Sequence, residues 1–212
     1  MRLKSALLLV LLIITALVIS FPKPEDAFTG ILIAILGFTI LNAYPFVYRF
    51  DLSKITNHLA VSGTFFCILY GWSSIISSSG FGSPGLFRFI GSFIILISIT
   101  GLILTLADWF GKIKTEGFAP KKLYTKGMFS LVRHPQTFLG MLFLFGLIIY
   151  ESSLILLITS PLWIVGFISY AAFEEKYDLV PRFEKEYLDY CEETPGLLPN
   201  KSSFNKFMKQ YN

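Results

Sequence analysis

The polar side chains that could carry chemistry are concentrated at residues 125–135, in a chain that is otherwise strongly apolar. Arg133 and His134 stand there directly before Pro135, and an apolar run follows. Proline is favoured in the first turn of a helix, because its missing N–H would have no partner at that position. We therefore expect Arg133 and His134 at a helix N-terminus, where free backbone N–H groups and the helix dipole favour an anionic group such as a carboxylate.

A second group of ionisable residues follows the last apolar run of the chain. Glu174 and Glu175 come directly after it, and they are the nearest candidate bases for an acceptor that must lose a proton. Taken alone, such glutamates would be solvated residues, and Arg133 and His134 would be basic anchors at a membrane interface. The order in which these groups follow one another favours a functional site instead.

This ordered set of motifs resembles a family of membrane enzymes. The pattern Thr-x-Gly-x-aromatic at 125–129 is followed by Arg-His-Pro, the paired glutamates, Phe-Glu-Lys-Glu-Tyr-Leu-Asp-Tyr at 183–190 and Pro-Gly-Leu-Leu-Pro at 195–199. Together these segments resemble the isoprenylcysteine carboxyl methyltransferases and the related phospholipid and thiol methyltransferases. The resemblance covers residues 115–200 and implies a membrane-embedded methyltransferase that uses S-adenosylmethionine.

The resemblance also implies which residues form the site. Those implied to bind the cofactor are Leu123, Tyr124, Phe129, His134, Pro135, Gln136 and Thr137, and those implied to be catalytic are Arg133, Glu174 and Glu175. Within this set Glu175 would face the methyl acceptor, and Arg133 would help to shape the site.

Two positions depart from the family pattern, and the second of them bears on the acceptor. Thr137 stands where a tyrosine is usual, and Ala171 stands where the prenylcysteine enzymes carry an arginine. Alanine cannot pair with an acceptor carboxylate through charge-assisted hydrogen bonds. The acceptor therefore stays open among a prenylcysteine-like carboxylate, a phospholipid amine and a thiol. Each is lipophilic or accessible from the membrane.

The chemistry of methyl transfer fits a site of this kind. Displacement at a sulfonium removes its positive charge, so a dry and well-oriented site accelerates the reaction mainly by positioning. A carboxylate or thiolate acceptor arrives already charged, whereas an amine must lose a proton. The rings of Tyr124, Phe129 and Tyr187 could face the sulfonium, although ordinary packing explains them equally well.

The composition requires lipid as the solvent for most of the chain. The 212 residues are 54% hydrophobic, 17% aromatic and only 15% charged, which is too apolar for a single water-soluble core. The long apolar runs predict an all-α, polytopic transmembrane helical bundle of about six spans. The expected spans are 6–21, 28–48, 59–76, 89–107, 138–150 and 154–173. The fifth is short and should form a tight helical hairpin with the sixth.

Loop charges predict the orientation of these spans. Lys and Arg gather in alternate loops, with the largest group between residues 112 and 133, so both termini and the active site should be cytoplasmic. Because the Lys and Arg residues lie in loops, where they set the orientation in the membrane, they do not indicate a nucleic-acid partner. The sequence around Cys67 and Cys191 has no metal-ligand spacing, so no metal is expected. The expected partners are a lipophilic substrate from the bilayer and membrane lipids.

Finer features are predicted along the chain. Asn42 within the second run should form a helix-to-helix hydrogen bond. Residues 174–190 should form an amphipathic helix that Pro181 breaks or kinks, and 194–199 should fold back as a turn. We divide the chain into N-terminal transmembrane helices, 1–112, and a catalytic region, 113–212, within one integrated membrane domain.

Two other functions are compatible with these patterns. Membrane reductases of the sterol type share an Arg-His-containing segment and a similar tail, and they would bind NADPH. A non-catalytic membrane scaffold could keep the same fold without the reaction, which the departures at Thr137 and Ala171 allow. The His-Pro pair favours the methyltransferase over the reductase.

Overall fold

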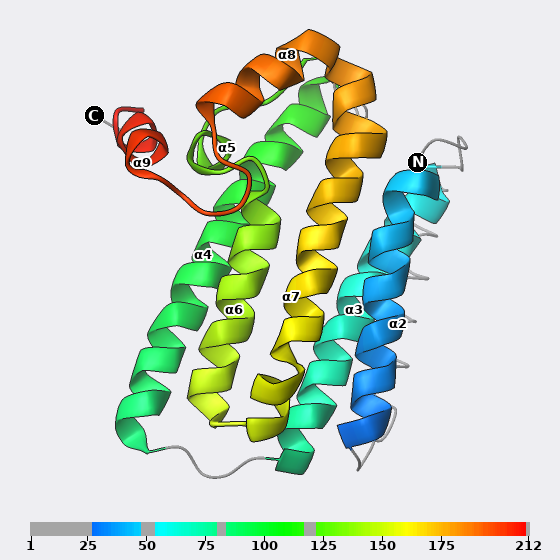
Figure 1. The fold of residues 1–212 in the computed structure, drawn as a ribbon, viewed down its shortest axis with the longest axis vertical. Coiled ribbons are helices and arrows are strands. Elements are labelled where there is room, and N and C mark those ends of the chain that lie inside the picture. The colour runs from blue at the N-terminus through cyan, green and yellow to red at the C-terminus, as the bar shows by residue number, and fades with distance from the viewer. Residues whose placement is uncertain (1–26, 48–53, 80–83, 117–121, 211–212) are drawn as a thin grey trace. The chain divides into compact units, whose positions relative to one another are not determined.

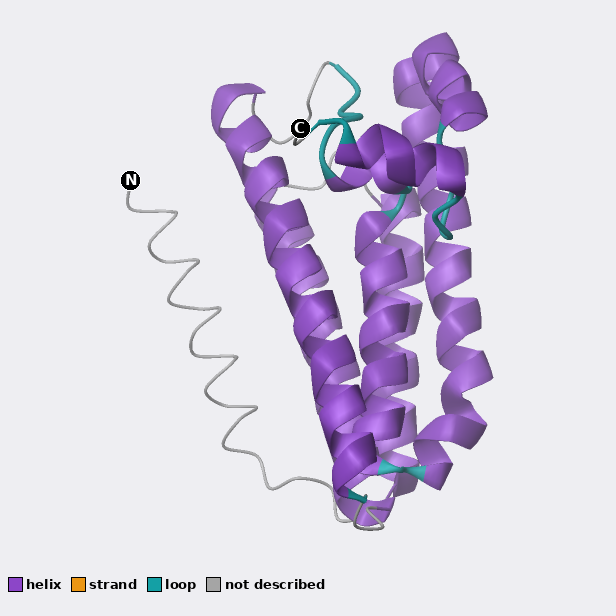
Figure 2. Cartoon of the chain, turned by 90° about the vertical axis from the view of Figure 1, so that its left-hand side faces the viewer, coloured by secondary structure: helices purple, strands orange, loops and turns teal. Residues whose placement is uncertain are grey.

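A computed structural model describes residues 27–47, 54–79, 84–116 and 122–210. Every regular element in these ranges is a helix (Figure 2), which confirms the predicted all-α class. In chain order (Figure 1) they are α2 (Ala27–Val47), α3 (Lys54–Ser79), α4 (Gly85–Glu116), α5 (Met128–Leu131), α6 (Pro135–Glu151), α7 (Leu154–Glu174), the π-helix η2 (Glu175–Leu179), α8 (Val180–Glu193) and α9 (Lys201–Met208). The first expected span, 6–21, lies outside the described residues.

Two of these helical stretches are long and apolar enough to cross a membrane. They are Gly85–Ala107 within α4 and the continuous helix Leu154–Glu193. The apolar part of the second stretch ends at Phe173, and a helix of about 20 residues already crosses the hydrocarbon layer, so we place Glu174 and the residues after it outside the span. Shorter apolar stretches lie in α2, α3 and α6. A bundle of six spans stays a prediction.

The chain forms two compact units, and the boundary between them falls inside α7. One unit comprises Met1–Phe81 and Ser153–Gly166, and the other comprises Gly82–Ser152 and Phe167–Asn212. All the residues of the predicted site belong to the second unit. The division of the chain near residue 112 stays a prediction.

Close backbone contact between α2 and α3 organises the first unit. A Cβ atom added to Gly71 would lie 2.5 Å from the carbonyl oxygen of Gly30 and 2.7 Å from the amide nitrogen of Ala34. Small residues allow helices to approach in this way, which strengthens packing where no hydrophobic effect acts between helices. The three small side chains therefore set the distance between the two helices.

An aromatic cluster joins the first half of α7 to this helix pair. The ring of Trp163 lies 5.6 Å from that of Phe38 and 6.5 Å from that of Trp72, between ring centroids. One turn further along α2, the side-chain amide of Asn42 donates to the carbonyl of Gly166 at 3.1 Å. This bond between α2 and α7 confirms the predicted helix-to-helix role of Asn42.

A tight turn joins α6 to α7, as the predicted hairpin requires. Ser152 follows α6 in the left-handed conformation, with φ 51° and ψ 36°, and α7 begins two residues later. The last turns of α7 come back to the first turns of α6, where Phe167 packs so closely on Gly140 that an added Cβ atom would meet the ring at 2.9 Å. The hairpin thus brings the end of α7 to the start of α6.

The tail helix differs from the prediction in the position of its kink. The chain is helical through Pro181, which sits in the first turn of α8, and the π-helical turn η2 precedes it. The break lies instead at Glu184, with φ 44° and ψ −119°. A positive φ at a residue other than glycine is strained. The change of direction buries Phe183, Tyr187 and Tyr190 together, which stabilises the strained conformation.

Alanine substitutions at two glycines of α3 test the close contact in the first unit. Gly71→Ala should destabilise the protein by about 1–3 kcal/mol, because the new methyl group has no room beside Gly30 and Ala34. Gly63→Ala is the matched control, since no other packing atom of the described residues lies within 4 Å of its added Cβ. The control should keep or raise stability, because alanine is the better helix former by about 1 kcal/mol. Thermal unfolding of the purified protein in detergent checks both; equal midpoints for the two variants would contradict the packing.

Candidate active site

The start of α6 and the turn after α8 fix the Arg133-His134 pair by its backbone. Pro135 is the first residue of α6, as predicted, and His134 precedes it as the N-cap. The amide of Arg133 donates to the carbonyl of Pro195 at 2.9 Å, and that of His134 donates to the carbonyl of Gly196 at 3.1 Å. These bonds confirm that residues 194–199 fold back as a turn. The backbone of the turn therefore holds the backbone of Arg133 and His134 in place, independently of their side chains.

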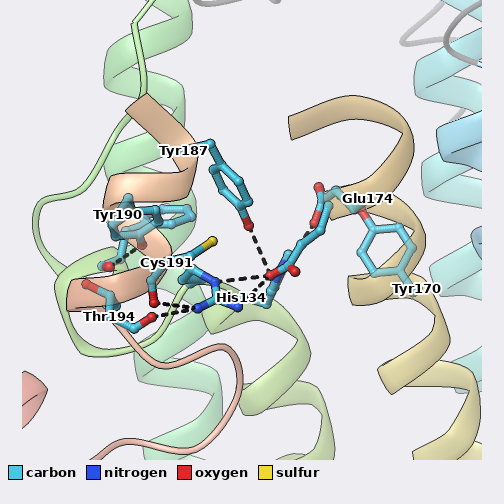
Figure 3. A network of polar contacts seen from close by, with 10 residues as sticks. His134, Tyr170, Glu174, Tyr187, Tyr190, Cys191 and Thr194 are labelled. Carbon is cyan, nitrogen blue, oxygen red and sulfur yellow. Dashed lines mark hydrogen bonds and ion pairs between the residues drawn. The ribbon is translucent and has the colours of Figure 1, made fainter. Parts of the chain in front are cut away.

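His134 lies between two carboxylates (Figure 3). Its Nδ1 is 3.0 Å from Oε2 of Glu174, and its Nε2 is 2.8 Å from Oε1 of Glu175. Burial of the ring disfavours its charged form, but the hydrogen bonds and charges of the two glutamates outweigh burial and raise the pKa of His134 to about 9. The imidazole is therefore a cation at neutral pH. The carboxylates expected at this helix end come from the chain itself.

A single oxygen of Glu175 accepts hydrogen bonds from three side chains. Besides His134, Oε1 of Glu175 receives Nε of Arg133 at 3.1 Å, Nη2 of Arg133 at 3.0 Å and the hydroxyl of Tyr187 at 3.0 Å. Burial opposes the ionised form, but the contacts with His134 and Arg133 dominate and lower the pKa of Glu175 to about 2. Glu175 is thus a fixed anion and a weak base at neutral pH.

The third guanidinium nitrogen of Arg133 is hydrogen-bonded to backbone carbonyls of the tail. Nη1 donates to the carbonyl of Thr194 at 2.7 Å and to that of Cys191 at 3.3 Å. These bonds, together with those to Glu175, join the start of α6, the end of α7 and the end of α8 through one side chain. Arg133 acts within the protein as a cross-link between these three segments.

Of the four charged side chains in the cluster, the two carboxylates are the more exposed. The side chains of Glu174 and Glu175 are 30% and 27% exposed, whereas those of His134 and Arg133 are 4% and 15% exposed. Two cations and two anions balance, and within the described residues Oε2 of Glu175 accepts no hydrogen bond. The cluster therefore presents its carboxylates to the surroundings more than its cations.

The other residues implied to bind the cofactor lie in the segment before α6 and in its first turn. Leu123 packs against Phe183, Tyr187 and Tyr190, so it contacts the tail helix that supports Glu175. The rings of Tyr124 and Phe129 meet edge to face, 5.5 Å apart between centroids. The Phe129 carbonyl accepts a hydrogen bond from the hydroxyl of Tyr190.

Pro135, Gln136 and Thr137, which are also implied to bind the cofactor, form the first turn of α6. Pro135 and Thr137 are buried, and Gln136 is partly buried. In the part of the chain that the structure describes, no hydrogen bond joins the side chain of Gln136 or Thr137 to Glu174 or Glu175. The structure therefore brings Arg133, His134, Glu174 and Glu175 into direct contact and leaves Gln136 and Thr137 beside them.

Two tyrosines of the cluster were not assigned as site residues from the sequence. Tyr187 donates to Glu175 and is almost fully buried, and burial together with the charge of Glu175 raises the pKa of its hydroxyl, which keeps it protonated as a donor. Tyr170 donates to Oε1 of Glu174 at 3.3 Å from one turn before it. The spacing of four residues between Tyr170 and Glu174 is a signal that could have identified the second tyrosine.

Comparison with known proteins bears on this region. The model of the phospholipid methyltransferase family matches residues 85–180, from the first residue of α4 to the first residue of α8. No curated protein and no solved structure matches the chain significantly. The matched range contains Arg133, His134, Glu174 and Glu175, and with the two long apolar helices it indicates a membrane protein with methyltransferase activity. The match confirms the predicted resemblance, since residues 85–180 are similar to the phospholipid methyltransferase family.

Proposed function

We propose that the protein is an S-adenosylmethionine-dependent methyltransferase that takes a lipophilic acceptor from the bilayer. The observation that carries this proposal is the cluster in which His134 lies between Glu174 and Glu175 and in which Arg133 ties the tail to Glu175. Its residues come from the start of α6 and the end of α7, both within the range matched by the methyltransferase family. A membrane protein of that family needs a polar site beside the lipid phase, and this cluster supplies one.

The chemistry of the cluster fits the cofactor. S-adenosylmethionine carries a sulfonium and an ammonium group, and the most exposed charged side chains of the cluster are its carboxylates, with Oε2 of Glu175 accepting no hydrogen bond among the described residues. The nearby rings of Tyr124 and Phe129 would add about 0.5–2 kcal/mol for a cation placed over a ring face. When bound, the cofactor supplies an electrophilic methyl group. Glu174 and Glu175 would attract its cationic part, and the other residues implied to bind the cofactor would line the remainder.

The residues around Glu175 favour an amine or thiol acceptor over a carboxylate. Ala171 is buried one turn before Glu175 and offers no charge to an acceptor carboxylate. Arg133 is already hydrogen-bonded to Glu175 and to two tail carbonyls, so it is not free to replace the missing arginine. An amine acceptor would have to give up a proton, and Glu174 is the more exposed of the two carboxylates that could receive it.

The position of the site supports cofactor entry from the cytoplasm. The basic segment that precedes α6 includes the exposed residues Lys122 and Lys126, and short basic segments lie on the cytoplasmic side of membrane proteins. We propose that the soluble cofactor enters from that side and that the acceptor arrives laterally through the bilayer. The cytoplasmic location of both termini belongs to the same proposal.

Replacement of Glu175 tests the proposed site. Glu175→Gln should lower kcat/KM for methyl transfer by about 100-fold or more and weaken S-adenosylmethionine binding, because the cluster loses its fixed anion. Glu186→Gln is the matched control on the exposed face of α8 and should behave as the parent. Calorimetry with the cofactor and transfer of labelled methyl groups to membrane lipids, thiols and proteins provide the readouts. Absence of cofactor binding by the parent protein would refute the proposal, and NADPH binding in its place would support the reductase.

The ionisation of His134 predicts how stability depends on pH. A histidine in the unfolded chain has a pKa of 6.5, whereas that of folded His134 is about 9. Its stabilising contribution is therefore complete below pH 6.5 and is lost as the pH rises through 9. The shift corresponds to at most about 3 kcal/mol. The thermal unfolding midpoint of the parent protein should therefore decrease as the pH rises from 6.5 to 9.

The matched variant for this pH dependence is His134→Gln, which keeps a donor but cannot carry the charge. Its unfolding midpoint should be lower at pH 6 and should change less with alkaline pH. At the acid end, Glu175 loses its contribution as the pH falls from 4.5 through about 2, because its folded pKa is depressed. Parallel alkaline curves for the parent and His134→Gln would show that His134 is not a cation in the folded protein.

A further inference from the structure

The C-terminal helix α9 is a defined helix that packs against α5 (Figure 1). A capping box begins it, in which Oδ1 of Asn200 accepts the amide of Ser203 at 2.8 Å and Oγ of Ser203 accepts the amide of Asn200 at 3.1 Å. After the helix, Oε1 of Gln210 accepts the amide of Gly127 at 2.9 Å. Both ends of α9 are therefore fixed, and its faces point in fixed directions.

The packing of Phe207 sets the depth of α9 relative to the span in α4. Phe207 lies against the cluster of Met128, Leu131 and Leu139, and Leu102 of α4 packs against the same cluster. Leu102 precedes Ala107, the end of the apolar stretch, by five residues, which is about 7.5 Å along a helix. An interfacial helix lies about 5–10 Å into the boundary between headgroups and acyl chains. The packing of Phe207 thus places α9 near the end of the apolar stretch of α4, where a membrane surface would lie.

The exposed face of α9 is apolar at that depth. Phe204 and Met208 are 52% and 43% exposed and lie one turn apart on the same face, next to the packed Phe207. Leu198, in the turn that leads into the helix, is 70% exposed. Large apolar side chains grouped in this way are unfavourable in water and mark an interaction surface.

The charges of α9 indicate what this face meets. Residues 201–210 contain Lys201, Lys206 and Lys209 and no acidic residue. Lys206 pairs with Glu193 at 2.8 Å, whereas Lys201 and Lys209 are exposed at the two ends of the helix. A basic residue near a membrane surface contributes about 1 kcal/mol of attraction to anionic lipids. The pattern complements an anionic lipid surface.

We propose that α9 is an interfacial helix bound to the anionic surface of the bilayer that holds the spans, with Phe204 and Met208 among the acyl chains and Lys201 and Lys209 on lipid headgroups. The turn before α9 supplies the carbonyls of Thr194, Pro195 and Gly196 that hold Arg133 and His134. Lipid binding by α9 therefore restrains the tail that closes the candidate site.

Fluorescence quenching tests the depth and direction of α9. The full-length protein is reconstituted in vesicles of phosphatidylcholine and phosphatidylglycerol whose acyl chains are brominated near the carbonyl. The added emission of Phe204→Trp over the parent should be blue-shifted and strongly quenched. The matched control is Ser202→Trp, since Ser202 is exposed on a face about 160° away around the helix. Its added emission should be little quenched; equal quenching of the two variants, or none in Phe204→Trp, overturns the proposal.

Energy transfer tests the preference for anionic headgroups. Transfer from Phe204→Trp to a dansyl-labelled phosphatidylglycerol should exceed transfer to dansyl-labelled phosphatidylcholine severalfold. The additional changes Lys201→Gln and Lys209→Gln should abolish the difference between transfer to the two lipids. The tryptophan at position 204 should nevertheless stay among the acyl chains. Equal transfer to both lipids in the Phe204→Trp protein overturns the anionic preference. Neither measurement needs cofactor or acceptor, so their outcome is independent of the proposed methyl transfer.

Discussion

The site depends on one carboxylate oxygen, Oε1 of Glu175, which receives hydrogen bonds from Arg133, His134 and Tyr187. These donors come from the segment before α6 and from α8, so a single atom joins parts of the chain that are separated by the whole hairpin. Loss of one partner from this partly buried ion pair would leave the remaining charge uncompensated and destabilise the protein. The arrangement is therefore a constraint on which conformations the tail can adopt.

Helix geometry explains why two adjacent glutamates can hold one imidazole. Neighbouring side chains on a helix project about 100° apart, so Glu174 and Glu175 can approach the two ring nitrogens of His134 from different sides. The π-helical turn that begins at Glu175 widens the helix at this point, and such turns are frequent at functional sites. The kink at Glu184 then brings Tyr187 back to Glu175. Local distortions of one helix thus complete the cluster.

The sequence predicted the parts of this structure that local chemistry determines. Apolar runs indicated the all-α class and the tight hairpin. Proline positions indicated the helix start at Pro135 and the turn after residue 193, and the isolated polar residue Asn42 indicated a bond between helices. The position of the kink and the hydroxyl donor Tyr187 did not follow, because both depend on how Phe183, Tyr187 and Tyr190 pack together. Helix α9 was not predicted either, since eight residues carry too weak a periodic pattern to be recognised without their packing partners.

The charged members of the cluster differ in their ionisation and therefore in what they can do chemically. His134 and Arg133 are cations whose donors are used within the protein, so they set the charge of Glu175 and do not need to contact an anionic substrate. Glu175, whose pKa is lowered to about 2, is an anion at neutral pH, which suits it to attract or orient a cation. Glu174 is the other carboxylate of the cluster, and fewer donors surround it than surround Glu175. A site of this kind favours positioning over acid–base catalysis, which is what displacement at a sulfonium requires.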